Sequence, residues 1–241
     1  MPKKTLIITD VTKMSNDNVC IAGYDDTLRC IRPVLSRGQL RKKHLFKDGE
    51  LVIFPGAKIL FNFGSGISQP PHVEDIIFEE TSIESMGRAT VREWKEVLTQ
   101  AATQNVSEIF THIEDRCVPP GSPGPSIGTL VLAKIPTLSC DYYKDPLRPK
   151  MRFVDQDGIV KNNVPITDLA FRNLFDLYLV KFKNNCEKTV KLLNNKLADH
   201  DIYLRLGLSR SYRGCCWLQV NGIHTFPDLY DRDYDEWIRS D

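Results

Sequence analysis

The sequence predicts a mainly β fold with inserted helices, an α+β arrangement of two small barrels, and three observations lead to this prediction. Runs of strand-forming residues occupy both ends of the 241-residue chain. Helical patterns interrupt these runs without alternating with them regularly, which argues against a parallel α/β sheet. Residues 118–125 read VPPGSPGP, and so many prolines and glycines exclude regular structure. We therefore place the boundary between the two units near this segment.

The first unit begins with short strands that are joined by turns. Residues 24–27 and the Pro55-Gly56 pair carry turn-forming side chains. Five runs around them are rich in strand-forming residues, namely 6–9, 19–23, 28–34, 51–54 and 57–63. Apolar residues at helical spacing follow at Val91, Trp94, Val97, Leu98 and Ala101. The first unit is thus predicted to be a small barrel with a helical extension, which includes a second short helix over 106–113.

The second unit repeats this mixture of strands and helices. Its predicted strands are 129–138, 150–154, 159–160, 202–208 and 216–220. Thr167 or Asp168 can cap a helix that starts at Leu169, and a further helix is expected over 186–198. The predicted organisation is a first barrel with its helical extension at 1–118, a linker at 119–128, a second barrel with inserted helices at 129–227 and an acidic aromatic tail at 228–241.

Several phrases follow one another in order over nearly the whole chain. They are Val19-Cys20-Ile21-Ala22-Gly23-Tyr24-Asp25, Leu28-Arg29-Cys30-Ile31-Arg32-Pro33-Val34, Pro70-Pro71-His72-Val73-Glu74-Asp75, Val164-Pro165-Ile166-Thr167-Asp168, Leu206-Gly207-Leu208-Ser209-Arg210 and Trp217-Leu218-Gln219-Val220-Asn221-Gly222-Ile223. Together they resemble the bacterial dual OB-containing domain family. The resemblance implies two tandem OB-like β-barrels and a role in binding nucleic acid or a nucleotide. This poorly characterised family has no established catalytic residues, so the resemblance assigns none.

Composition and charge exclude several classes of protein. A hydrophobic content of 41% and a charged content of 26% are typical of a folded chain. The net charge of +1 gives no global attraction to nucleic acid or membrane, so such binding needs a local patch. No stretch approaches the ~20 apolar residues of a membrane span, and we expect a cytoplasmic protein without a membrane partner. The seven cysteines are odd in number and scattered, so they are expected to be reduced and buried.

Two groups of side chains are the predicted nucleic-acid contacts. OB barrels bind single strands through a basic groove and through aromatic side chains on which bases stack. The first group lies on and after the third predicted strand and consists of Arg32, Arg37, Arg41, Lys42, Lys43 and Lys47. The second group lies near the last two strands and consists of Arg205, Arg210, Tyr212 and Arg213. The alternative is that both groups are ordinary solvated surface, with the second paired to the acidic tail.

A histidine and two carboxylates form a weaker candidate for catalysis. His72, Glu74 and Asp75 lie close together in the sequence, and on a strand His72 and Glu74 would share one face. A hydrogen-bonded structural role is the commoner explanation of such a group. No second phrase completes a metal site, so neither a metal nor another cofactor is expected.

Two tryptophans receive opposite predictions. Trp217 lies beside Cys216 on a short predicted strand and is expected in the core. Trp237 and Tyr234 are spaced for one helical face in the acidic tail, where they can dock on another protein or fold back on the body.

The leading hypothesis is a module that binds single-stranded DNA or RNA, or a nucleotide, within a larger bacterial system. The first alternative is a protein-interaction adaptor that uses the tail at 228–241. The second is an enzyme that processes nucleotides or nucleic acid through His72, Glu74 and Asp75, and we consider an enzyme less well supported than a binding module.

Overall fold

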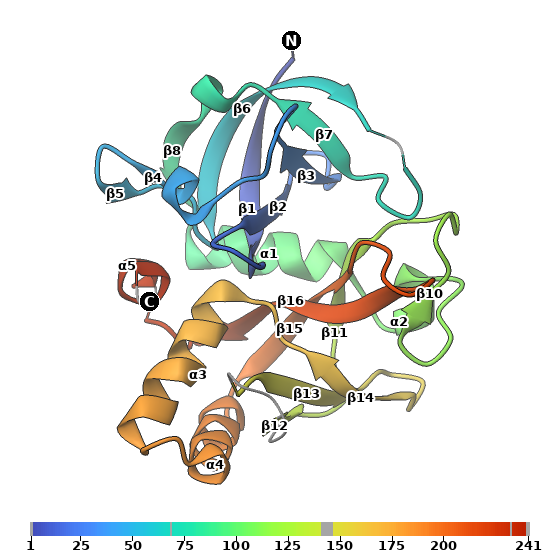
Figure 1. The fold of residues 1–241 in the computed structure, drawn as a ribbon, viewed down its shortest axis with the longest axis vertical. Coiled ribbons are helices and arrows are strands. Elements are labelled where there is room, and N and C mark those ends of the chain that lie inside the picture. The colour runs from blue at the N-terminus through green and yellow to red at the C-terminus, as the bar shows by residue number, and fades with distance from the viewer. Residues whose placement is uncertain (1, 68, 141–146, 232, 240–241) are drawn as a thin grey trace.

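The computed structural model describes residues 2–67, 69–140, 147–231 and 233–239. It is mostly β, with 43% strand and 23% helix, which confirms the mainly β prediction with inserted helices. Figure 1 shows the N-terminal strands in the upper half of the molecule and the C-terminal strands in the lower half, with helix α1 (Val91–Ala101) between them.

The N-terminal strands close into a five-stranded barrel. Their order is β1-β2-β3-β7-β6, and β6 pairs with β1 again. Only the β3–β7 pair of this ring is parallel. The strands of the ring are β1 (Lys3–Lys13), β2 (Val19–Tyr24), β3 (Cys30–Val34), β6 (Ala57–Gly66) and β7 (Asp75–Phe78).

Alternating side chains explain why these segments form a barrel. In β6 every second residue from Ala57 to Phe63 is buried, so one face of the strand fills the barrel interior. Gly23 allows β2 to approach β1, because a Cβ there would lie 2.4 Å from the Ile7 carbonyl oxygen. Smaller elements lie outside the ring. They are the 3₁₀ turns at Lys42–Leu45 and Glu80–Ser82, the hairpin of β4 (Phe46–Lys47) and β5 (Glu50–Leu51), and strand β8 (Glu84–Arg88), which pairs with β6.

The C-terminal strands form a five-stranded and a three-stranded sheet. The larger has the order β10-β16-β15-β11-β9 and the smaller β12-β13-β14. A parallel bridge from Ile166, just after β14, to Val220 of β16 joins the two into a half-barrel. The strands are β9 (Ala102–Thr103), β10 (Cys117–Val118), β11 (Ile127–Val131), β12 (Thr137–Cys140), β13 (Pro149–Val154), β14 (Val160–Pro165), β15 (Asp201–Leu208) and β16 (Cys216–Phe226).

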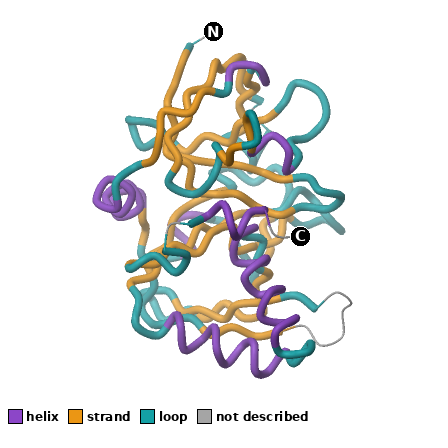
Figure 2. Tube along the Cα trace, turned by 90° about the vertical axis from the view of Figure 1, so that its left-hand side faces the viewer, coloured by secondary structure: helices purple, strands orange, loops and turns teal. Residues whose placement is uncertain are grey.

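Each long helix starts at a side-chain cap. Thr90 and Glu93 form a capping box at the start of α1, which buries Trp94 and Leu98. Asp168 caps α3 (Leu169–Lys181) and Asn185 caps α4 (Cys186–Leu197). Figure 2 shows α3 and α4 in the half of the molecule far from the N-terminus. The two short helices are α2 (Val106–Ile109) and α5 (Tyr234–Arg239).

Several boundaries differ from the predictions. The strand expected over 129–138 is interrupted, and its two parts are β11 and β12. The helix expected over 106–113 ends at Ile109. The helical extension of the first unit also contributes to the second, because β9 pairs with β11. Strand β10 lies just before the predicted linker and pairs with β16, so the proline-rich loop is held at both ends by one sheet.

The two halves meet through a buried polar cluster. Arg205 of β15 is fully buried, and its Nε donates to Asp10 Oδ2 of β1 at 2.8 Å. Its Nη1 donates to the hydroxyls of Tyr24 and Thr129, and Nη2 donates to Cys30 Sγ. Burial of an arginine is costly unless its donors are satisfied, and the N-terminal barrel supplies most of the acceptors.

The acidic tail is folded onto this body. Tyr230, Tyr234 and Ile238 are buried, and the Tyr234 ring lies 6.0 Å from that of Phe54 and 6.3 Å from that of Trp94. Of the two outcomes left open for the tail, folding back is therefore the one observed, and its aromatic residues are mostly core rather than a free docking surface.

Candidate nucleic-acid interface

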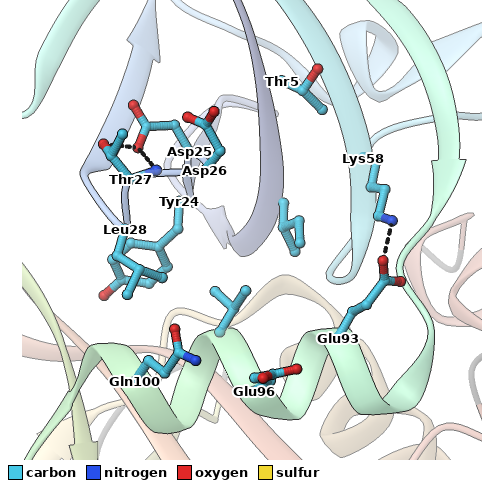
Figure 3. A pocket seen from close by; sticks show the side chains of 12 residues that line it. Thr5, Tyr24, Asp25, Asp26, Thr27, Leu28, Lys58, Glu93, Glu96 and Gln100 are labelled. Atoms are coloured by element: carbon cyan, nitrogen blue, oxygen red, sulfur yellow. Dashed lines mark hydrogen bonds and ion pairs between the residues drawn. The ribbon is translucent and has the colours of Figure 1, made fainter.

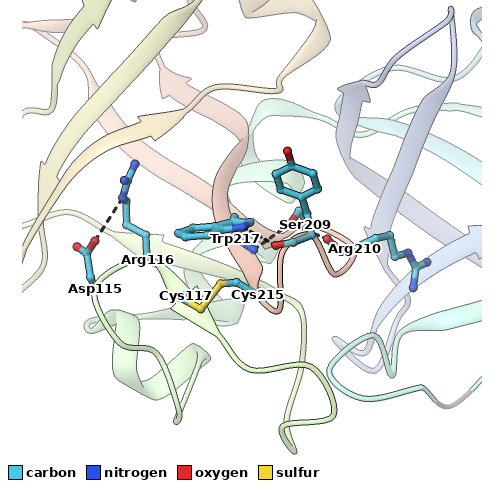
Figure 4. Close-up of a disulfide and its surroundings, with 8 residues drawn as sticks. Asp115, Arg116, Cys117, Ser209, Arg210, Cys215 and Trp217 are labelled. Carbon is cyan, nitrogen blue, oxygen red and sulfur yellow. Dashed lines mark hydrogen bonds and ion pairs between the residues drawn. A yellow bond between two sulfur atoms is a disulfide. The ribbon is translucent and has the colours of Figure 1, made fainter.

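The connection between β15 and β16 is a tight hairpin. Arg213 and Gly214 both have positive φ, which is typical of a two-residue turn of the primed type. The Tyr212 amide donates to the Cys215 carbonyl at 2.8 Å. Trp217 is tied to the same hairpin, because its amide donates to Ser209 Oγ and its Nε1 donates to the Tyr212 carbonyl. Figure 4 shows the Trp217 ring beside the Ser209 and Arg210 segment.

This hairpin presents two aromatic side chains to solvent. Tyr212 is 60% exposed and Trp217 is 36% exposed. The prediction that Trp217 belongs to the core is therefore wrong. The signal was in the sequence: Trp217 alternates with Cys216 and Leu218, both buried, so the strand turns its side chain outward.

Three arginines, Arg116, Arg210 and Arg213, lie on or beside this hairpin. Arg213 lies over the Tyr212 ring with its guanidinium carbon 5.2 Å from the centroid, and the structure gives it no acidic partner among the described residues. Arg116, which the sequence analysis did not select, is 30% exposed in its side chain. Its carbonyl accepts from the Leu218 amide and its Nη1 donates to the Asn163 carbonyl at 2.7 Å, so Arg116 is held next to Trp217. We call Arg116, Arg210, Tyr212, Arg213 and Trp217 the hairpin surface.

A disulfide ties this surface to the segment that carries Arg116. Cys117 and Cys215 are bonded, with their Cα atoms 5.6 Å apart (Figure 4). A second disulfide joins Cys140 and Cys186. The prediction that all cysteines are reduced is thus wrong for four of them, because the fold brings together cysteines that are 98 and 46 residues apart in sequence.

Arg210 and Arg32 share one buried carboxylate. Asp75 accepts from Arg32 Nε and from Arg210 Nη2, both at 2.5 Å. The Arg210 side chain is 52% exposed, whereas Arg32 is only 5% exposed. Arg210 therefore remains accessible to a ligand, but the predicted phosphate contact by Arg32 is corrected, because this guanidinium faces the interior.

The predicted contact by Arg205 is corrected for the same reason. Its side chain has no exposed area and its ion pair with Asp10 lies between the two halves. Arg205 was selected because it lies near the last two strands, but Asp10, Tyr24 and Cys30 of the N-terminal barrel cover its guanidinium.

The three residues proposed for catalysis have structural roles. His72 and Glu74 lie in a turn before β7 rather than on a strand. Glu74 is buried and accepts from the amides of Ser126 and Ile127 and from Ser126 Oγ. Burial and the neighbouring guanidinium groups of Arg32 and Arg210 lower the pKa of His72 to about 4. A carboxylate that is saturated with donors and a neutral, buried imidazole are poorly placed for proton transfer.

No group of three or more metal-ligating side chains converges anywhere in the described residues. Within the same residues, no helix has both the length and the apolar character needed to span a membrane.

Apart from Arg32, the first basic group lies on another part of the molecule. Arg37, Arg41, Lys43 and Lys47 are exposed, and Lys42 Nζ donates to the carbonyl of Arg239 in α5. In Figure 1 the β4–β5 hairpin of this loop is on the left and β10, next to the hairpin surface, is on the right. The two predicted groups therefore do not line one continuous groove.

Comparisons with known proteins add little to this geometry. No family model matches the chain and no curated protein matches it. One chain of a structure described as a replication protein A heterotrimer bound to single-stranded DNA matches with 8% identity and a TM-score of 0.22. The match covers 97% of this chain and 66% of that chain. A TM-score this low carries no argument about fold or function.

Proposed function

We propose that the protein is a tandem OB-fold module that binds single-stranded nucleic acid through the hairpin surface. The observation that carries the proposal is the presence of two exposed aromatic rings and three guanidinium groups on and beside one hairpin. Proteins that bind single strands combine stacking platforms with cationic groups for the phosphates.

Strand order supports the assignment of two OB folds. In the N-terminal barrel the five strands are paired in the order first, second, third, fifth, fourth and first, as in an OB fold. The C-terminal half has the same order if β11 and β12 are the two parts of one first strand: β12-β13-β14-β16-β15-β11. The pairing between the third and fifth strands is parallel in both halves.

This correspondence identifies the hairpin surface with the loop between the fourth and fifth strands. In OB folds that loop and the loop between the first and second strands border the ligand face. In the N-terminal barrel the described part of the equivalent loop, residues 69–74, packs against the other half. There the Glu74 carboxylate accepts from the Ser126 amide, and the Pro70 carbonyl accepts from the Gly121 amide. The C-terminal loop is the one that remains exposed.

The test is fluorescence anisotropy with labelled single-stranded DNA and RNA, with duplex controls, over a range of salt concentrations. We expect Trp217→Ala to weaken single-strand binding by about fivefold to a hundredfold, since base stacking contributes ~1–3 kcal/mol per base. Arg213→Gln is expected to reduce the slope of affinity against salt concentration.

Two matched variants serve as controls. Leu177→Ala removes another exposed apolar side chain, on α3, and Lys43→Gln removes one charge from the first basic loop. Both are expected to bind like the native chain. If Trp217→Ala binds as tightly as the native chain, the proposal is contradicted. If only Lys43→Gln loses binding, the site lies on the first basic loop instead.

A further inference from the structure

An open groove of about 530 Å³ runs between the N-terminal barrel and helix α1. Figure 3 shows Asp25 and Asp26 on the barrel side of this groove and Glu96 on the helix side. Carboxylates on both sides repel phosphates, so a single strand bound at the hairpin surface is not expected to continue into the groove. The hairpin surface is thus the place where binding can be regulated, and it contains a disulfide.

The Cys117–Cys215 disulfide lies beside the exposed ring of Trp217. Cys117 is directly opposite Trp217 in the pairing of β10 with β16, and Cys215 precedes Trp217 by two residues. Side chains in these two relations share one face of a sheet, so the disulfide and the ring are neighbours (Figure 4). The cross-link therefore joins the segment that carries Arg116 to the segment that carries the stacking platform.

The two disulfides of the chain differ in their access to solvent. Cys117 is half-buried and Cys215 is 3% exposed, whereas in the second disulfide Cys140 is 9% exposed and Cys186 is 4% exposed. A thiol reductant must reach one of the sulfur atoms, and exposed disulfides exchange more readily than buried ones. Attack is therefore expected at Cys117 Sγ, and at the hairpin disulfide before the second one.

Cationic side chains outnumber carboxylates around this disulfide. Arg116 precedes its first cysteine, and Arg213 lies two residues before its second. Lys161 Nζ donates to the Asp115 carbonyl in the same segment as Arg116. Against these three cations are Glu114 and Asp115, and the Asp115 carboxylate lies 3.6 Å from Arg116 Nε. The excess of positive charge favours the approach of a thiolate and stabilises the thiolate that leaves.

Few other contacts hold β10 in place. It pairs with β16 over two residues only, whereas β15 pairs with β16 along all of its eight residues. Beyond this short pairing, the Leu218 amide donates to the Arg116 carbonyl, and Arg116 Nη1 donates to the Asn163 carbonyl. Reduction of the disulfide is therefore expected to loosen Arg116 while the strand that carries Trp217 stays in its sheet.

We propose that Cys117 is a site of thiol–disulfide exchange, through which a dithiol weakens the binding of single strands at the hairpin surface. This inference rests on the proposed function of that surface. A thiolate of the dithiol attacks Cys117 Sγ, the bond to Cys215 breaks, and Cys215 leaves as a thiolate that takes up a proton. The second thiol of the reductant then displaces Cys117. Two electrons and two protons pass to the protein, and the reductant becomes a cyclic disulfide.

The first experiment measures which disulfide is reduced first. The native chain is incubated with dithiothreitol, samples are alkylated with iodoacetamide at intervals, and mass spectrometry follows the peptide that contains each cysteine. We expect Cys117 and Cys215 to be alkylated at least about tenfold faster than Cys140 and Cys186, because the hairpin disulfide is the accessible one. Equal rates, or earlier reduction of the second disulfide, would overturn the proposal.

The second experiment compares the binding of one variant in its two redox states. Cys140→Ser with Cys186→Ser keeps the hairpin disulfide alone, so dithiothreitol acts only there. In the anisotropy assay, reduction is expected to weaken single-strand binding about threefold to tenfold, because loosened side chains must be ordered again on binding. Oxidised glutathione is expected to restore the affinity. The matched control, Cys117→Ser with Cys215→Ser, is expected to bind equally with and without dithiothreitol.

A signal that needs no nucleic acid separates failure of this switch from failure of the proposed function. In the ¹⁵N-labelled Cys140→Ser, Cys186→Ser protein, the Trp217 indole signal is expected to shift on reduction. The signals of Trp94 and Trp237 are expected to stay, because those rings pack in the core and against the tail. A shift of Trp217 with equal binding in both states would overturn the switch and leave the proposed function standing. Absence of binding in both states would overturn the proposed function itself.

Discussion

Among single residues, Arg205 makes the contact on which the joining of the two halves depends most. Its guanidinium reaches Asp10, Tyr24, Thr129 and Cys30, and the Asp10–Arg205 pair is almost fully excluded from solvent. A buried charge whose partner is removed is left uncompensated, and this costs more than the pair contributes.

Arg205→Met is therefore expected to lower the free energy of unfolding by about 3–5 kcal/mol, because Asp10 is left buried without its cation. Urea denaturation followed by circular dichroism measures this change. Lys95→Met is the matched control, since it breaks an exposed pair with Asp201 and is expected to cost less than about 1 kcal/mol. If the two variants lose equal free energy of unfolding, the buried Asp10–Arg205 pair contributes no more to stability than an exposed pair.

His72 makes stability depend on pH in the acidic range. Its pKa in the folded protein is about 4, below the ordinary value near 6.5, so the unfolded chain takes up the proton first as pH falls. Stability from this group is present above pH 6.5 and is lost as the pH falls towards 4. Between pH 7 and pH 4.5 the native chain should lose about 2–3 kcal/mol more than His72→Gln, as measured by urea unfolding at each pH. Parallel profiles of the two proteins would contradict a buried, neutral His72.

The accessibility of individual arginines was only partly predictable from sequence. The hairpin residues Arg210, Tyr212 and Arg213 were selected correctly as exposed, because turn-forming residues mark a surface segment. The burial of Arg32 and Arg205 was not predicted. Their acidic partners, Asp75 and Asp10, are 43 and 195 residues away in the sequence, and the local pattern does not reveal such pairings.

At the scale of elements, the Cys117–Cys215 disulfide holds β10 and the hairpin together. It closes a separation of 98 residues, and cross-links over long loops restrict the unfolded chain most. Replacing both cysteines by serine is expected to cost about 2–5 kcal/mol. It is also expected to weaken single-strand binding, because hydrogen bonds alone then hold Arg116 beside Trp217.

The second disulfide provides the control for this prediction. Cys140→Ser with Cys186→Ser removes a cross-link at β12 and α4, outside the hairpin surface. This variant is expected to lose stability and to retain binding in the anisotropy assay. Similar loss of binding in both double variants would mean that the first disulfide contributes through stability alone.

Helix α5 is a structural element and not an appendage. Tyr234 and Ile238 are buried, the Trp237 carbonyl accepts from Asn173, and Arg239 Nη2 donates to the Gly49 carbonyl. Deletion of residues 234–241 is expected to lower the unfolding free energy by about 3 kcal/mol or more, since it exposes apolar surface around Trp94 and Phe54. If the truncated chain has the same urea denaturation curve as the native chain, the tail does not stabilise the fold. The alternative hypothesis of a free docking segment would then be favoured.

Local patterns predicted the elements better than their partners. The helix over Val91–Ala101 and the helix that starts at Leu169 follow from apolar spacing and a capping side chain. Strand β7 and the pairing of β9 with β11 could not be predicted in this way. β7 has four residues and β9 has two, and segments this short acquire their structure from the neighbouring strands.

For the whole molecule, the sequence predicted two small β units, and the structure shows how extensively they are joined. Backbone hydrogen bonds cross from Lys13 to Thr167 at 2.7 Å, the Glu74 carboxylate holds Ser126, and one apolar core runs through both halves. Contacts of this kind leave each half with buried polar groups that lack partners when the other half unfolds.

We therefore expect the two halves to unfold together. Differential scanning calorimetry should show one transition whose calorimetric and van't Hoff enthalpies agree, which is the test of two-state behaviour. A segment of residues 1–118 expressed alone should lack the native chemical-shift pattern, because Asp10 and Glu74 lose the partners that neutralise and satisfy them. Arg205→Met weakens the same contact and is expected to broaden or divide the transition. Two separate transitions in the native chain would show instead that each barrel is stable by itself and that the buried polar cluster only orients one against the other.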